Sequence, residues 1–179
     1  KTLFFSLEMS AKMIYERMLS CKCGILYDDF CKNNLTAENV ETVKAEMRGL
    51  YKTNNFICFD NVYSAEQISG ITLEEKPDLV IVDFMQNVTT NERFDNTRTR
   101  IDYISALLKR TAKQANCVMM ILSQVTRMGK DEPTMSDLKE SGGLEQDGDY
   151  ITLLHRPYVN DKSNTKKKKK TTQVLLDKN

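Results

Sequence analysis

Two uninterrupted apolar runs constrain the fold of this chain more than any other feature. Leu79–Val82 and Val118–Leu122 contain only aliphatic residues and Met, with no polar residue alternating among them. A strand that is apolar at every position is typical of burial on both faces, as in parallel sheets. Helical patterns of apolar residues alternate with such strand-length runs. This alternation predicts an α/β fold, in which a layered, mostly parallel sheet is flanked by helices.

Six segments have the character of strands, and four polar caps mark the starts of helices. The predicted strands are Leu3–Leu7, Phe56–Asp60, Leu79–Asp83, Cys117–Gln124, Tyr150–Arg156 and Thr172–Leu176. The predicted caps are Ser10, Thr36, Ser64 and either Thr97 or Thr99. A stripe at helical spacing, from Ile101 to Ala115, gives the last of these helices the clearest apolar face.

Size and charge indicate one domain with a basic end. The chain has 179 residues, 40% of them apolar, which is enough for a substantial core, so residues 1–179 are treated as one domain. Residues 156–179 carry eight Lys and Arg against two Asp and Glu, although the net charge of the chain is only +1. Six of these basic residues, Lys162 and the run Lys166–Lys170, fall in an insert at about 158–171. We expect this insert to be flexible and solvated, with contact to a polyanion as the alternative.

Other features disfavour membrane, secreted and metal-binding proteins. No apolar run approaches the roughly 18 residues of a membrane span, and no secretory signal is evident, so a cytoplasmic location is expected. The five cysteines have no zinc-site spacing and His155 is the only histidine, which favours reduced thiols without a metal role. The chain lacks an initiator Met and opens in a predicted strand, so we expect a fragment of a longer protein.

Polar side chains follow three of the predicted strands, at the point where each strand ends. Glu8 follows the first strand, Asp83 ends the third, and Ser123 and Gln124 close the fourth. Ligands of open parallel sheets bind at the carboxyl ends of the strands. An aspartate there suits Mg²⁺ beside nucleotide phosphates, and a nearby glutamate can activate water. The set therefore favours nucleotide hydrolysis, although each residue alone also fits a solvated loop.

The segment Ser136–Asp149 is polar and lies between two predicted strands. Gly142 and Gly143 allow close approach of the backbone, and Lys139 adds a positive charge. Lysine and free backbone amides are the usual contacts to a nucleic-acid backbone, which need no base reading. A plain surface turn with a short helix is the alternative.

Four strings, in this order and at these spacings, resemble the C-terminal ATPase domain of DnaB-type replicative helicases. They are F-F-S-L-E-M at 4–9, V-I-V-D-F-M-Q at 80–86, I-L-S-Q-V-T-R at 121–127 and S-D-L-K-E-S-G-G-L-E-Q-D-G-D at 136–149. The resemblance covers nearly the whole chain and implies a RecA-like fold. No G-x-x-x-x-G-K-[ST] sequence occurs in the chain, so the N-terminal P-loop strand is expected to be lacking. Because that strand lies inside RecA-like sheets, the resemblance implies a sheet that has a gap or that closes in another way.

The resemblance also implies roles for individual residues around ATP and Mg²⁺. Glu8 matches the catalytic glutamate that activates water, and Asp83 matches the aspartate that holds Mg²⁺. Gln124 matches the glutamine that links the γ-phosphate to the DNA-binding loops. Arg17 matches an arginine that approaches the nucleotide. Lys178 matches the first basic residue of a finger that reaches the neighbouring subunit's nucleotide.

For DNA, the resemblance places Lys139, Glu140 and Gly142 in the loop that follows the single-stranded backbone. It implies a homohexameric ring that couples ATP hydrolysis to translocation on single-stranded DNA and unwinding of the duplex, with primase and a helicase loader as partners. A RecA-, RadA- or KaiC-like ATPase is one alternative. A second alternative is a non-catalytic ring or DNA-binding subunit without a P-loop.

Overall fold

The computed structural model describes residues 1–125, 133–138, 142–156 and 172–178. Its centre is a four-stranded parallel sheet with the strand order β2-β1-β3-β4. The strands are β1 (Thr2–Ser6), β2 (Phe56–Phe59), β3 (Leu79–Asp83) and β4 (Val118–Ile121). The predicted ends of these four strands agree within about three residues. The register sets Leu3 of β1 opposite Val80 of β3, so the two central strands begin and end together.

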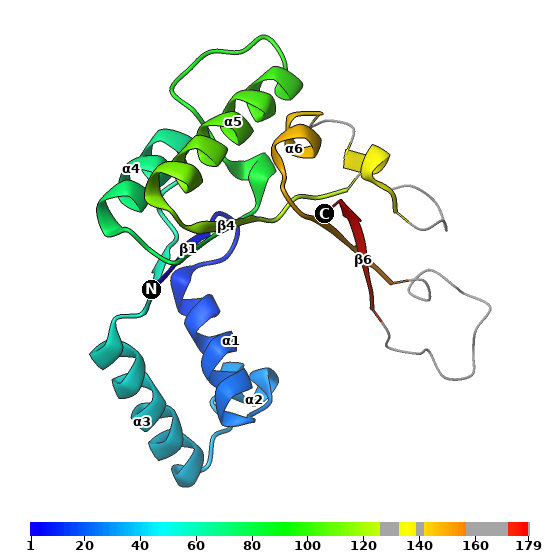
Figure 1. Ribbon diagram of the computed structural model, residues 1–179. Coiled ribbons are helices and arrows are strands. Elements are labelled where there is room, and N and C mark those ends of the chain that lie inside the picture. The colour runs from blue at the N-terminus through cyan, green and yellow to red at the C-terminus, as the bar shows by residue number, and fades with distance from the viewer. Residues whose placement is uncertain (126–132, 139–141, 157–171, 179) are drawn as a thin grey trace, which may run out of the picture.

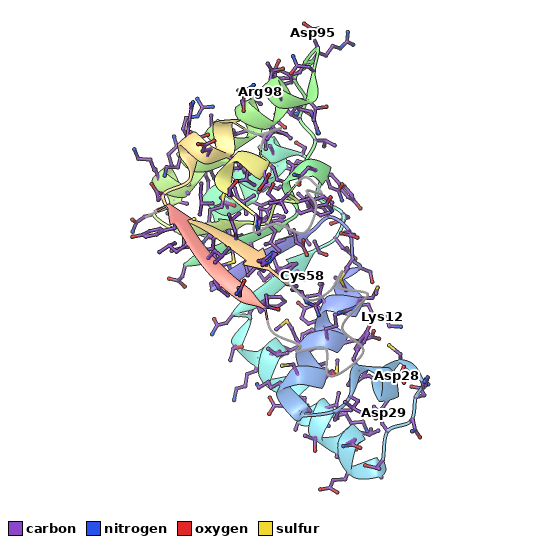
Figure 2. The ribbon with its side chains drawn as sticks, turned by 90° about the vertical axis from the view of Figure 1, so that its right-hand side faces the viewer. Lys12, Asp28, Asp29, Cys58, Asp95 and Arg98 are labelled. Atoms are coloured by element: carbon purple, nitrogen blue, oxygen red, sulfur yellow. The ribbon has the colours of Figure 1, made fainter. Side chains whose placement is uncertain are left out.

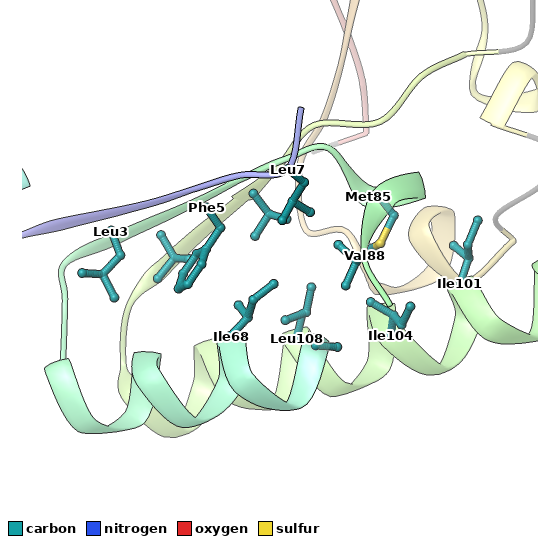
Figure 3. Close-up of a cluster of buried hydrophobic side chains, with 12 residues drawn as sticks. Leu3, Phe5, Leu7, Ile68, Met85, Val88, Ile101, Ile104 and Leu108 are labelled. Carbon is teal, nitrogen blue, oxygen red and sulfur yellow. The ribbon is translucent and has the colours of Figure 1, made fainter. Parts of the chain in front are cut away.

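The core lies between one face of this sheet and the helices α4 (Ala65–Glu75) and α5 (Thr97–Ala115). Alternate residues of β1 and β3 point into it, because successive side chains of a strand leave opposite faces. Figure 3 shows Leu3, Phe5 and Leu7 above Ile68 of α4 and Leu108 of α5. These five residues are fully or almost fully buried.

The prediction that the two apolar runs are buried on both faces is only partly right. Val80 and Val82 of β3 are fully buried, and Ile81 between them is partly exposed. On β4, Val118 is 64% exposed and Met120 is 53% exposed. Within the described residues, α4 and α5 cover one face of the sheet, and no helix covers this part of the other face (Figure 1).

Helix α1 (Ala11–Cys23), α3 (Ala37–Thr53) and α4 begin at the predicted caps Ser10, Thr36 and Ser64. The prediction for α5 was wrong, since its cap is Asn96, whose side chain accepts a hydrogen bond from the Thr99 amide. Asparagine is a stronger N-cap than threonine because its carbonyl reaches the free amides of the first turn well. Thr97 is therefore the first helical residue, so the helix begins one residue earlier than a Thr97 cap implies and three residues earlier than a Thr99 cap implies.

The helices α1, α2 (Tyr27–Cys31) and α3 form an arm that projects from the sheet in Figure 1. Helix α2 was not predicted, because five residues are too short for a visible periodicity. The arm is the crossover between β1 and β2. It is joined internally by an ion pair between Lys22 and Glu46 at 2.5 Å. At the sheet it is held by the Tyr15 ring, which packs edge-on against Phe56 of β2.

The strands β5 (Ile151–His155) and β6 (Gln173–Lys178) pair antiparallel in a second sheet, separate from the first. Two short elements precede them, the 3-10 helix η2 (Met135–Leu138) and α6 (Gly142–Asp147). Leu138, Ile151 and Leu153 form a small core of their own. None of the described helices is long and apolar enough to cross a membrane.

Candidate nucleotide-hydrolysis site

The carboxyl ends of β1, β3 and β4 meet at one edge of the sheet. Ser6 of β1 stands opposite Asp83 of β3, and the Leu122 amide donates to the Val82 carbonyl at 3.0 Å. Glu8, Asp83 and Gln124 follow or end these strands. The structure therefore brings together the three residues that the sequence predicted for the nucleotide-hydrolysis site.

Glu8 is exposed, but the loop around it is held at both ends. The Leu7 amide donates to the Asp83 carbonyl at 2.8 Å, and the Asn87 side chain donates to the Leu7 carbonyl at 3.2 Å. Beyond Glu8, the Ala11 amide donates to the Asp60 carboxylate at 2.7 Å. These bonds fix the backbone and leave the Glu8 side chain facing solvent. Asn87 and Asp60 were not predicted, because their contacts depend on the strand register.

Asp83 is a half-buried carboxyl with a negative neighbour. Burial raises the pKa of Asp83, and the negative charge of Glu8 raises it further. The first effect reflects the loss of water around the carboxyl, and the second places two negative charges near each other, which favours binding of a cation. Within the described residues no cluster of three or more potential ligands could hold a metal ion by itself. Mg²⁺ typically takes one or two carboxylates and completes its shell with water and phosphate oxygens, so these two carboxylates fit Mg²⁺ bound together with a nucleotide.

Gln124 is held through its backbone by Gln86, which lies in the 3-10 helix η1 (Met85–Asn87) after β3. The side-chain nitrogen of Gln86, Nε2, donates to Ser123 Oγ at 3.0 Å and to the backbone carbonyl of Gln124 at 3.3 Å. The Gln124 amide donates back to Gln86 Oε1 at 3.3 Å. The side chain of Gln86 thus joins the segment that follows β3 to the segment that follows β4. Gln86 is part of the second matching string, but its spacing alone did not show this role.

Arg17 lies on α1, seven residues into the arm, and is exposed. Its guanidinium carbon sits 4.8 Å from the centre of the Tyr27 ring on α2, a cation–π distance. Its predicted place beside a nucleotide stays a prediction.

The predicted DNA-binding residues are only partly described. Lys139 and Glu140 lie outside the described residues, as does the whole of the predicted insert at about 158–171. Gly142 is the first residue of α6, close to the guanidinium of Arg98 on α5. Lys178 is the last residue of β6, and its backbone pairs with Ile151. The placement of its side chain lies outside the description.

A family model described as "DnaB-like helicase C terminal domain" matches residues 1–179. The chain belongs to this family. It is 30% identical over 161 residues to a "Probable plasmid replicative DNA helicase" of Chlamydia muridarum, covering 86% of this chain and 36% of the relative. It is 31% identical over 169 residues to "Replicative DNA helicase DnaB" of Mycobacterium leprae, covering 90% of this chain and 28% of that protein.

Two of the solved structures that match the chain have the same fold. One is described as an ATPase domain, with a TM-score of 0.86 and 27% identity, and the match covers 99% of this chain and 66% of that one. Another, a DnaB-like replicative helicase described with its interactions with primase, has a TM-score of 0.85 and 28% identity over 99% of this chain and 45% of that one. The predicted RecA-like α/β fold and the predicted family are therefore confirmed. This DnaB-like domain spans 36% and 28% of the length of the two relatives named above.

Proposed function

We propose that this DnaB-like domain is the motor of a replicative DNA helicase, which couples ATP hydrolysis to translocation on single-stranded DNA and unwinding of the duplex. The observation that carries the proposal is the meeting of Glu8, Asp83 and Gln124 at one edge of the sheet, in a chain of this family. Their chemistry matches the three tasks of a nucleotide motor, which are activation of water, binding of Mg²⁺, and detection of the γ-phosphate.

Glu8 is the residue for water activation. Its carboxylate is exposed on a loop with fixed backbone, so it can accept a proton from a water molecule without rearrangement of the chain. General-base catalysis of this kind contributes about 10² to 10⁴ in rate, and it requires the base to be held in place. The hydrogen bonds from Asn87 and to Asp60 supply that restraint.

Asp83, with Glu8 nearby, would hold Mg²⁺. The metal would supply charge neutralisation for the phosphate oxygens of ATP. Asp83 belongs to the central strand β3 and is half-buried, so its carboxylate is positioned by the core and not by a loop. The negative charge of Glu8 beside it adds to the attraction for a cation.

Gln124 is the residue for detection of the γ-phosphate. An amide both donates and accepts hydrogen bonds, so it can change partner when the phosphate leaves. Its backbone is tied to the exit of β3 by Gln86, and the chain after it continues toward the segment Ser136–Asp149. We propose that Lys139, Glu140 and Gly142 of that segment follow the backbone of single-stranded DNA.

The same proposal includes an assembly and partners. The parent protein would form a cytoplasmic homohexameric ring, in which Lys178 completes the nucleotide site of a neighbour and Arg17 approaches the nucleotide. Primase and a helicase loader are proposed as further partners. Support for primase comes from the structural neighbour that is described with its interactions with primase.

The test is ATP hydrolysis by the protein at the full length of its gene, with and without single-stranded DNA. We expect hydrolysis that DNA stimulates and that Glu8→Gln lowers by a factor of about 10² or more. Glu74→Gln, an exposed residue of α4, is the matched control and should retain the wild-type rate. If the wild-type protein does not hydrolyse ATP, the motor assignment is wrong and a non-catalytic ring or DNA-binding subunit is favoured.

A further inference from the structure

We infer that helix α5 is a coupling element, which connects the nucleotide edge of the sheet to the segment proposed to contact DNA. The inference rests on the proposed function. It adds a second route beside Gln124, and it assigns positioning roles to Arg100, Asp102 and Ser105, none of which the four matching strings contain. Helix α5 is suited to this because it contacts both regions through side chains on different faces.

The first contact is at the start of α5. Arg100 donates from Nη1 to the Val88 carbonyl at 2.6 Å and from Nη2 to the Gln86 carbonyl at 3.4 Å. These carbonyls belong to the segment that directly follows Asp83. Gln86 also holds the Gln124 backbone through its side chain. A shift of the segment after β3 would therefore be passed to α5 through the guanidinium of Arg100.

The second contact is a polar stripe along α5. Its members are spaced at four, three and four residues, so they lie on one side of the helix: Arg98, Asp102, Ser105 and Lys109. Each faces the segment Gly142–Asp149 (Figure 2 labels Arg98 near the start of α5). This is the described part of the fourth matching string that lies against α5.

The contacts of the stripe are short and involve charges. Asp102 Oδ1 accepts from the Gly143 amide at 2.7 Å, and Ser105 Oγ donates to Asp147 Oδ2 at 2.6 Å. Lys109 forms an ion pair with Asp149. Ser105 is only 3% exposed, so its bond to a carboxylate is shielded from water. Hydrogen bonds with a charged partner contribute about twice as much as neutral ones.

Gly143 shows how closely the segment approaches the helix. A Cβ atom at this position would lie 2.7 Å from Asp102 Oδ1 and 2.9 Å from Asp102 Cα. The second atom belongs to the helix backbone and cannot turn aside. Gly143 is therefore required by the contact with α5, which explains a glycine inside a helical segment, where glycine is otherwise unfavourable.

Between its two contacts α5 is rigid. Its face toward the sheet is packed into the core by Ile101, Ile104 and Leu108, each fully buried. Close-packed cores transmit strain and have low compressibility. A displacement at Arg100 would thus be passed along the helix to Asp102 and Ser105, through a packed path of the kind that can couple two sites.

The experiment compares ATP hydrolysis by the full-length protein carrying Asp102→Ala, with and without single-stranded DNA. We expect the stimulation by DNA to fall about threefold to tenfold, while hydrolysis without DNA stays within about twofold of wild type. Asp102→Asn keeps an oxygen for the Gly143 amide and should restore most of the stimulation. Gln114→Ala, an exposed change on the same helix, is the control and should have no effect.

Further variants provide independent tests of the inference. Gly143→Ala should also lower the stimulation, whereas Gly70→Ala, where a Cβ would meet no atom within 4 Å, should not. Arg100→Ala and Asp102→Ala should be non-additive when combined, since they interrupt the same route. If Asp102→Ala lowers hydrolysis equally with and without DNA, or changes neither, α5 is only structural. A wild-type protein without ATPase activity would instead refute the proposed function itself.

Discussion

At the scale of single residues, the candidate site depends on side chains that hold other residues in place. Gln86, Asn87 and Asp60 make no predicted contact with a nucleotide, yet their hydrogen bonds set the backbone of Gln124 and of the Glu8 loop. An exposed catalytic carboxylate on a free loop would spend most of its time away from the reactive geometry. In the proposed function, this restraint is what keeps the Glu8 carboxylate in its reactive geometry.

Replacement of Gln86 tests this restraint. Gln86→Ala removes three hydrogen bonds of about 1 kcal/mol each or less, so we expect the DNA-stimulated kcat to fall about fivefold to tenfold with little change in the KM for ATP. Steady-state kinetics of the full-length protein measure both constants. Gln67→Ala, an exposed change on α4, is the control. An unchanged kcat would show that the Gln124 backbone is held without Gln86.

The sequence was sufficient to predict that Glu8, Asp83 and Gln124 lie at one edge of the sheet, but not which residues hold their backbone in place. Glu8, Asp83 and Gln124 were predicted because each follows an apolar strand, and parallel strands end at one edge. Asp60 and Asn87 are polar residues near strand or turn ends, like many others in the chain. Only the register, which sets Ser6 opposite Asp83, shows that they reach the Glu8 loop.

At the scale of helices and strands, end-capping residues decide where helices begin. Three caps were predicted from Ser or Thr before an apolar pattern, and each accepts a hydrogen bond from the third residue of its helix. The α5 cap was assigned wrongly because Asn96, Thr97 and Thr99 all satisfy the same sequence rule. The choice between them depends on the backbone of the preceding loop, which the local sequence does not determine.

The cap assignment of α5 can be measured. Asn96→Ala removes the hydrogen bond to the Thr99 amide at 2.9 Å, so we expect a loss of about 1 kcal/mol in the free energy of unfolding. Thr97→Ala replaces the first helical residue and should lower the free energy of unfolding by a smaller amount. Urea denaturation followed by circular dichroism gives both values. A larger loss of unfolding free energy for Thr97→Ala would indicate that Thr97, and not Asn96, is the N-cap.

At the scale of the whole molecule, most of the buried residues lie between the four-stranded sheet and the helices α4 and α5. The main core joins the four-stranded sheet to α4 and α5, and α5 alone has five buried residues. The arm has fewer buried residues. In helix α3, Val43 is the only one of the 17 described residues that is buried. Stability should therefore differ strongly between the two parts.

Hydrogen exchange followed by mass spectrometry tests this difference. Amides of α3 should exchange about tenfold or more faster than those of the middle of α5, because opening of the arm exposes little apolar surface. Lys22→Ala, which removes the ion pair with Glu46, should speed exchange in α3 and leave α5 unchanged. Equal protection of α3 and α5 would mean that the arm and the sheet unfold as one unit.

The arm is also the connection between β1 and β2, and this position has a consequence for how the chain tolerates change. Asp60 and Phe56, both at or near β2, tie its helices to the sheet, while its tip carries Asp28 and Asp29 (Figure 2). Leu26 is 72% exposed, but its carbonyl accepts hydrogen bonds from the first turn of α2, so residues added at this turn are expected to disturb α2 and not the strand register. The exposed side-chain position of Leu26 is also a place to attach a fluorophore, so that movements of the arm can be followed without a change at the sheet edge.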